Sequence, residues 1–343
     1  MLSDADKQLS LIIFRLLKQA TSLKVVQNFL RTKGVKISAA NWDDLYEKRI
    51  EPALNAGQLS VVDLRTLLQR VEEFGRQHTF LFKCTPAHAQ ALMAPNRIRS
   101  IAREEGVEAL LETPLDLELP DHPTIVDIRL HQPDPNLIPA SLTIKVVEKR
   151  ITRTFDSENI DEAAGLITKQ YKFTVKRAVN IAILNHEGNL ELRIASQDNQ
   201  SKYTNLVREL LLKVRKFIPL DGFATVSLND AKTKILKDRV KLADEIRYSH
   251  STARNDLGAV MQISSSSQED NLSSDDGSMA ALDSFLASDG HVTGTNVYVK
   301  IPDTSPQREI HLLIGGEVNE FAVPVACSAE EYSYVRGKVI SLN

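Results

Sequence analysis

The spacing of the apolar residues changes once along the chain, and the change coincides with the densest run of prolines. Before residue 113 apolar residues recur every three or four positions, which is typical of amphipathic helices. Six of the thirteen prolines lie between residues 113 and 139. From residue 140 apolar and polar residues alternate, as in half-buried strands. These features predict a helical module over residues 1–112, a proline-rich connector over 113–139 with one short strand at 125–130, and a sheet region after it.

Capping residues divide the N-terminal module into short helices. Ser60 and Asp63 have the spacing of a capping box, and Thr85 followed by Pro86 has the order of a cap before a proline in the first helical turn. Pro52 falls inside another helical pattern, where it predicts a kink or a break. The module is therefore predicted to consist of roughly five or six helices joined by short loops.

A β-hairpin followed by a helix forms the centre of the predicted second domain, residues 140–263. Apolar residues alternate on both sides of the turn at 185–189 and recur at helical spacing from Leu206 to Phe217. The same order is predicted in residues 279–343, which complete the region. We also expect a short helix from Ile160 to Leu166. The predicted fold class is α+β: an N-terminal all-α module, then a mixed or antiparallel sheet with helices packed on one face.

A segment rich in serine and acidic residues interrupts the second region. Residues 264–278 are mostly Ser, Asp and Glu around Leu272. Low hydrophobicity and negative charge predict a disordered loop there.

Charge is distributed unevenly along the chain. Residues 1–242 contain 36 Lys and Arg against 30 Asp and Glu, whereas residues 243–343 contain 6 against 15. Such asymmetry indicates an anionic partner for the basic part, or an acidic segment that folds against it. Two solvated surfaces of opposite sign are the alternative.

Several classes of protein are disfavoured by what the sequence lacks. Cys84 and Cys327 are too few for a disulfide framework or a cysteine zinc site. The sequence has no apolar run of about eighteen residues and no basic-then-apolar start. We therefore expect an intracellular, cytoplasmic protein that has no membrane partner.

His78, Cys84 and His88 are the nearest approach to a ligand cluster. Their spacings fit no common zinc motif, so packed side chains are the simpler interpretation. No phosphate-binding glycine loop occurs in the sequence. We therefore predict no metal and no cofactor.

Asp127 and Glu148 lie on neighbouring candidate strands, where two carboxylates could hold the cation of a metal-dependent nuclease. Such a site also uses a lysine two residues after the glutamate. Here Glu148 and Lys149 are adjacent and would point to opposite faces of a strand. No catalytic residue is therefore predicted.

Clustered cations point most directly to a ligand. Phosphate backbones bind groups of Lys and Arg, and Lys234, Lys237 and Lys241 have the spacing to share one helix face. A solvated helix face is the alternative interpretation. The predicted nucleic-acid-binding residues are Lys213, Arg215, Lys216, Lys234, Lys237, Lys241, Arg97, Arg99 and Arg103.

Taken together, the patterns predict a non-enzymatic binding protein, a subunit of a larger assembly, that contacts nucleic acid through basic helices. A protein-only adaptor or scaffold is the first alternative. An unrecognised metal-dependent nuclease or another hydrolase is the second, because active sites without sequence motifs exist.

Overall fold

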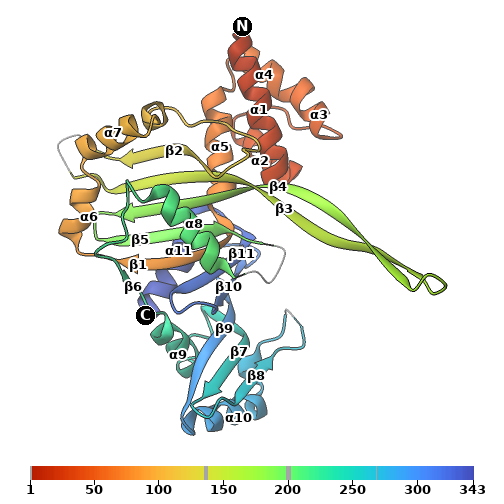
Figure 1. Ribbon diagram of the computed structural model, residues 1–343, viewed down its shortest axis with the longest axis vertical. Helices are drawn as coiled ribbons and strands as arrows, with labels where there is room; N and C mark the ends of the chain where they lie inside the picture. Colours follow the sequence, from red (N-terminus) through yellow and green to blue (C-terminus); the bar gives the residue numbers. More distant parts are fainter. Residues whose placement is uncertain (1, 135–137, 198–201, 268) are drawn as a thin grey trace.

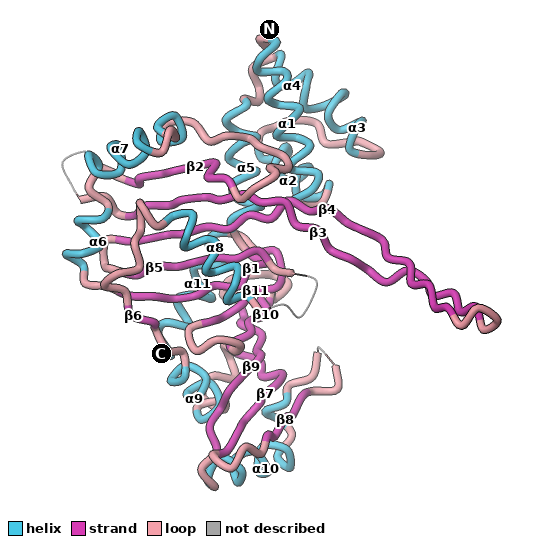
Figure 2. Tube along the Cα trace, in the orientation of Figure 1, coloured by secondary structure: helices cyan, strands magenta, loops and turns pink. Residues whose placement is uncertain are grey.

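The computed structural model describes residues 2–134, 138–197, 202–267 and 269–343. A bundle of short helices at the N-terminus lies beside a large antiparallel sheet, and a long two-stranded arm projects away from both (Figures 1 and 2). The predicted α+β class is confirmed.

Amphipathic helices build the N-terminal bundle. Ser60 caps the last of them in the predicted capping box. Pro52 lies in the first turn of α4, which begins where a π-helical turn ends, so a change of helix type stands at the predicted kink or break. Leu17, Leu30 and Leu64 are fully buried where the helices meet. The elements are α1 (Asp4–Ala20), α2 (Leu23–Thr32), α3 (Trp42–Leu45), η1 (Tyr46–Ile50), α4 (Glu51–Asn55) and α5 (Val61–Glu73).

Within the described residues, eleven strands form one sheet. Its order is β2-β3-β4-β5-β1-β11-β10-β9-β7-β8, and β6 pairs with β1 beside this path. The predicted central hairpin is β4 and β5, and the predicted C-terminal hairpin is β10 and β11. The strands are β1 (Gly75–Lys83), β2 (Thr124–His131), β3 (Ser141–Asp161), β4 (Leu166–Asn185), β5 (Asn189–Ala195), β6 (Ala224–Thr225), β7 (Ile246–Asn255), β8 (Val260–Ser264), β9 (Gly290–Lys300), β10 (Glu309–Ile314) and β11 (Glu320–Ala326).

Strand β1 lies in the middle of this sheet, although it comes from the segment predicted to be all-helical. It pairs with β5 on one side and with β11 on the other. Phe80 packs into the core on one face of the sheet, and Leu81 into the core on the other. A strand buried on both faces lacks a clean alternation of polar and apolar residues. For this reason the all-α prediction for residues 1–112 is wrong at residues 75–83, whereas helices follow as predicted between residues 86 and 111.

Helices cover both faces of the sheet, so the predicted packing on one face is wrong. Successive residues of β1 point to opposite faces of the sheet. The half-sheet on the β5 side buries the face that carries Phe80, and the half-sheet on the β11 side buries the face that carries Leu81. One half-sheet is covered by α6 (Pro86–Leu92), α7 (Pro95–Glu104), η2 (Glu108–Leu111) and α8 (Tyr203–Val214). The other is covered by α9 (Asn229–Lys237), η3 (Leu272–Ser274), α10 (Asp276–Ala287) and α11 (Ala329–Leu342).

The arm is the part of β3 and β4 that extends beyond the sheet, residues 151–175 (Figure 1). Its strands stay paired as far as Asp161 and Leu166, and Gly165 adopts a left-handed conformation in the turn. The predicted helix from Ile160 to Leu166 is therefore wrong. Seven residues of mixed character were too few to separate helical from alternating spacing.

Two other predicted segments carry regular structure. The short strand predicted within the connector is β2; residues 135–137 of the connector lie outside the described part. In the acidic segment 264–278, apart from Gln268, which is not described, regular structure after β8 is confined to η3 and the start of α10. Leu272 is buried in the core, and the Asn271 side chain accepts a hydrogen bond from the Tyr248 amide at 3.2 Å. One buried leucine anchors the polar residues around it.

Candidate functional site

Two of the predicted basic groups meet where α7 packs against the end of α8. The Arg97 guanidinium joins them, because it donates to the backbone oxygens of Leu92, Lys216 and Phe217 at 2.7, 2.9 and 2.9 Å. Burial lowers the pKa of Arg97. These bonds satisfy carbonyls at the end of α8, so Arg97 is a structural clamp and its donors are engaged.

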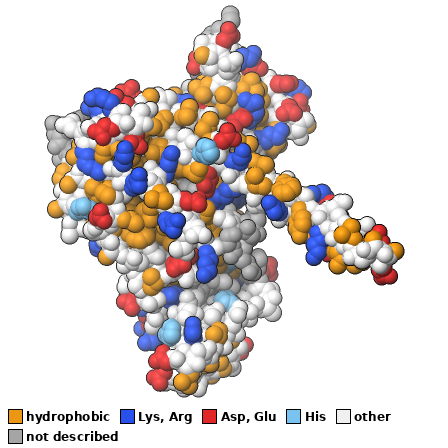
Figure 3. Space-filling model, in the orientation of Figure 1, with side chains coloured by type: hydrophobic (Ala, Val, Ile, Leu, Met, Phe, Trp, Pro, Cys, Tyr) orange, Lys and Arg blue, Asp and Glu red, His pale blue; other side chains and the backbone are white. Residues whose placement is uncertain are grey.

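The remaining cations of the two groups form what we call the α7–α8 surface. Figure 3 shows Lys and Arg side chains, interspersed with acidic ones, over the part of the molecule where α6, α7 and α8 lie. Arg99, Lys213 and Arg215 are exposed and have no ion pair within the described residues. The surface consists of Arg99, Arg103, Lys213, Arg215 and Lys216.

The other two cations of the α7–α8 surface have carboxylate partners. Arg103 Nη2 lies 2.9 Å from Glu108 Oε1, and Lys216 pairs with Glu105. The side chains of Arg103 and Lys216 are more than half exposed. Exposed ion pairs contribute little to stability, so breaking either pair costs little.

The third predicted group does not form a single helix face. Helix α9 ends at Lys237 and is capped by Asp238, so Lys241 lies beyond it in a turn. Lys241 Nζ pairs with Asp238 Oδ1 at 2.9 Å, whereas Lys234 and Lys237 are exposed. Figure 1 places α9 on the other half of the sheet from α7. The prediction of one shared face is therefore wrong, because the helix is shorter than the basic run.

Lys232, on the same helix, is buried with 5% of its surface exposed, and its Nζ donates to the Thr293 carbonyl at 3.3 Å. Burial lowers its pKa from 10.5. Methionine keeps most of the aliphatic length without the charge. We therefore expect Lys232→Met to raise the free energy of unfolding by about 1 kcal/mol at pH 7, measured by urea denaturation.

The pH dependence gives this prediction a sign that can be checked. Because the pKa of Lys232 is lower in the folded state, the unfolded chain binds more protons between the two pKa values, and wild-type stability rises with pH there. The advantage of the methionine variant should shrink as the pH approaches 10.5. Lys234→Met, at an exposed position, is the control and should change stability by less than about 0.5 kcal/mol. An equal gain at both positions would contradict the effect of burial.

Asp127 and Glu148 lie on opposite faces of the sheet. Asp127 is opposite Lys145 in the β2–β3 register, and Glu148 is three residues further along β3. Asp127 Oδ2 pairs with Arg129 Nε at 2.8 Å, and burial raises the pKa of Asp127. Glu148 Oε1 instead accepts a hydrogen bond from Asn180 Nδ2 at 2.9 Å. Since one cation cannot touch both carboxylates, the nuclease hypothesis is wrong for this pair.

His78, Cys84 and His88 are not brought together around a shared centre. His78 Nδ1 lies 2.6 Å from Glu320 Oε1, and the His78 ring stacks on Tyr203 at 3.8 Å. The His88 ring packs edge-on against Phe223. No group of three or more metal-ligating side chains occurs among the described residues.

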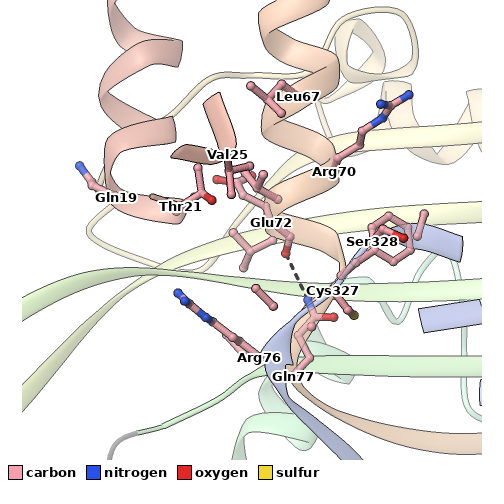
Figure 4. A pocket seen from close by; sticks show the side chains of 18 of the residues that line it. Gln19, Thr21, Val25, Leu67, Arg70, Glu72, Arg76, Gln77, Cys327 and Ser328 are labelled. Atoms are coloured by element: carbon pink, nitrogen blue, oxygen red, sulfur yellow. Dashed lines mark hydrogen bonds between the residues drawn. The ribbon is translucent and has the colours of Figure 1, made fainter. Parts of the chain in front are cut away.

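A groove of about 1080 Å³ lies at the root of the arm, between the helical bundle and the start of α11 (Figure 4). Arg76 lines it in a left-handed conformation, with a φ of 53°, next to a bulge in the pairing of β1 with β11. A bulge of this kind re-aims the side chain that it carries. Cys327 also lines the groove, but burial raises the pKa of its thiol to about 11, so the thiol is protonated at neutral pH.

A buried ion network lies next to the groove and joins the helical bundle to the sheet. Glu72, at the end of α5, pairs with Lys145 of β3, with 2.7 Å between Oε2 and Nζ, and also with Arg177 of β4. Glu73 Oε1 lies 2.7 Å from Arg129 Nη2 on β2. Buried charges need partners, so this network fixes where the bundle sits on the sheet.

Sequence reasoning missed the groove and the apolar face of the arm. The groove depends on residues from segments far apart in the chain, and the arm was divided by a predicted helix. The alternation of Ile151, Phe155, Phe173 and Val175 with polar residues was the signal available for the arm.

No helix among the described residues is long and apolar enough to span a membrane. No protein-family model matches the sequence, and the search of curated proteins gives no significant match.

Proposed function

We propose that this chain is a non-enzymatic intracellular binding protein, a cytoplasmic subunit of a larger assembly, that contacts the phosphate backbone of nucleic acid with its α7–α8 surface. The observation that carries the proposal is the Arg97 clamp. It holds α7 against the end of α8, two separate stretches of sequence that both carry exposed cations. Three of these cations have no intramolecular ion pair within the described residues, and two have weakly held exposed partners.

Contacts of this kind orient a protein on nucleic acid without reading its sequence. Release of counterions makes the affinity fall steeply with salt, by about 0.9 in the logarithmic slope for each phosphate neutralised on duplex DNA. We therefore expect binding that is sequence-tolerant and strongest at low ionic strength.

The test removes the three unpaired cations together. Arg99→Gln, Lys213→Gln and Arg215→Gln in one chain should flatten the slope of log affinity against log salt by up to about 2.7, measured by fluorescence anisotropy with a labelled duplex. Affinity should fall for all duplex sequences alike. The Arg97 clamp is left intact, so stability should change little.

A matched control removes equal charge elsewhere. Lys234→Gln, Lys237→Gln and Lys241→Gln lie on and after α9, and this triple variant should change the slope by less than about 0.5. Equal effects from the two triple variants would show a general charge effect and contradict a local surface. A wild-type chain that binds neither DNA nor RNA at low salt would remove the proposal.

A protein-only adaptor is the second candidate, and the arm favours it. The arm exposes large apolar side chains, such as Phe155 at 54% and Phe173 at 62%, which a phosphate backbone does not cover. If nucleic-acid binding fails, protein contact through the arm is the function that the geometry supports next.

A further inference from the structure

We infer that the arm pairs with the arm of a second copy of this chain, apolar face against apolar face, in an antiparallel arrangement about a two-fold axis. This inference concerns a surface remote from α7 and does not depend on nucleic-acid binding (Figure 1).

The arm is amphipathic along its whole length. Residues directly opposite each other in the register share a face, and alternate residues along each strand do too. One face is polar apart from Leu166 at the tip, with Thr152, Thr154, Asn159, Thr168 and Thr174 on it. The other face carries seven large apolar side chains: Ile151, Phe155, Ile160, Ile167, Tyr171, Phe173 and Val175.

Nothing in the described chain covers this apolar face. Each of its seven apolar side chains is between 48% and 62% exposed. A two-stranded ribbon on its own is marginally stable in water, and three or more strands or a packed face are usually needed. A ribbon that extends this far from the sheet therefore gains most from a partner that packs on its apolar side.

The order of side chains along the apolar face indicates that a second copy of the same arm is the partner. The register divides the face into five successive layers, each made of one residue from β3 and the residue opposite it on β4. From the root to the tip these layers are Ile151 with Val175, Arg153 with Phe173, Phe155 with Tyr171, Glu158 with Lys169, and Ile160 with Ile167.

The five layers read from root to tip are complementary to the same five layers read from tip to root. The central layer is the aromatic pair Phe155 and Tyr171, whose rings lie 6.0 Å apart edge to face. A two-fold axis through that layer places the apolar root of one arm on the apolar tip of the other. It also places Arg153 opposite the partner's Glu158. Every layer then meets one of compatible chemistry, which is what an isologous interface requires.

The bulge in β3 keeps the outer layers on the same face of the arm as the inner ones. The register shifts between Phe155 and Ser157, so the layer that follows Phe155 on this face is Glu158 rather than Ser157. Without the extra residue, Glu158 and Ile160 would lie on the polar face. The bulge therefore places both the acidic partner for Arg153 and the apolar tip where the reversed arm needs them.

The size of the face sets the expected strength. Five layers spaced by two residues span roughly 30 Å, and two such ribbons bury on the order of 1,000 Å² in total, at the low end for specific interfaces. We therefore expect a reversible dimer with a dissociation constant in the micromolar range.

Sedimentation velocity of the full chain, from about 1 to 100 μM, tests the inference. The wild-type chain should shift from monomer to dimer across this range. Phe155→Ser with Tyr171→Ser should leave a monomer at every concentration. Thr154→Glu with Thr168→Glu, two polar-face substitutions at similar distances along the arm, should leave the dimer unchanged. Circular dichroism should confirm that the sheet is intact in each variant.

A charge-reversal pair tests the antiparallel register. Arg153→Glu alone places like charges opposite each other twice in a homodimer, and so does Glu158→Arg alone. Each should raise the dissociation constant about tenfold. An equimolar mixture of the two variants restores both attractive contacts and should dimerise with nearly the wild-type constant. No parallel or sequence-tolerant association predicts this recovery.

Three results would overturn the inference. One is a wild-type chain that stays monomeric at 100 μM or dimerises equally well after Phe155→Ser with Tyr171→Ser. Another is a mixture of the charge variants that associates no better than either alone. The third is an arm that binds phosphatidylcholine vesicles or duplex DNA while the chain remains a monomer. That result would assign the apolar face to another partner.

Discussion

Replacing Glu72 by alanine should lower the free energy of unfolding by about 4 kcal/mol, because it leaves two buried cations without their shared carboxylate. Glu72 has 3% of its side chain exposed, and its partners Lys145 and Arg177 have 6% and 5%. Urea denaturation followed by circular dichroism measures the loss, and the transition should remain cooperative.

Two companion variants separate the loss of partners from the loss of packing. Glu108→Ala breaks the exposed pair with Arg103 and should cost less than about 0.5 kcal/mol. Methionine at Glu72, Lys145 and Arg177 together removes the charges with their partners, and most of the stability should return. If Glu72→Ala lowers the free energy of unfolding no more than Glu108→Ala does, the charges of the network are not buried as the structure describes.

Replacing Gly75 by alanine should cost about 3 kcal/mol or more, since the residue combines a left-handed backbone with a close approach of β11. The φ of Gly75 is 77°, a conformation that costs about 1–2 kcal/mol for residues with a Cβ. An added Cβ would lie 2.1 Å from the Val325 carbonyl oxygen and 2.9 Å from Ala326 Cα. Both contacts are to backbone, so the strand pairing itself would have to shift.

Gly57 supplies the matched control. Its φ is 71°, but a Cβ there would meet nothing within 4 Å. Gly57→Ala should therefore cost only the free energy of a left-handed backbone at a residue with a Cβ, about 1–2 kcal/mol. The difference between the two variants in thermal or urea unfolding measures the clash with β11. Equal losses would mean that β1 and β11 are further apart than described.

The parts of the fold that sequence predicted correctly are those in which one periodic pattern spans a whole element. The helices of the bundle, α8, and the hairpins β4–β5 and β10–β11 have one clear apolar face each, so their spacing was enough. β1 was missed because it is buried on both faces. The arm was missed because the helix predicted over its tip divided it, although apolar and polar residues alternate on both sides of that tip.

The candidate sites depended on information that spacing does not contain. The cations of α7 and α8 were recognised one by one, but their meeting rests on the bonds of Arg97 to carbonyls some 120 residues away. Asp127 and Glu148 lie on adjacent strands, as the sequence predicts. Their separation by the sheet depends on the β2–β3 register, which includes a shift between Ile125 and Asp127. A one-residue difference in register decides on which face a side chain lies.

The position of β1 at the centre of the sheet has a consequence for synthesis on the ribosome. β1 emerges early, and β5 follows it, but the strand on its other side is β11; His78 and Glu320, which meet across that pairing, are 242 residues apart in the chain. Contacts of such long range form slowly, and an unpaired strand edge invites association with other chains. A nascent chain therefore holds an open edge in the middle of its sheet until β11 has been made, and a C-terminal truncation would expose the centre of the molecule rather than shorten its rim.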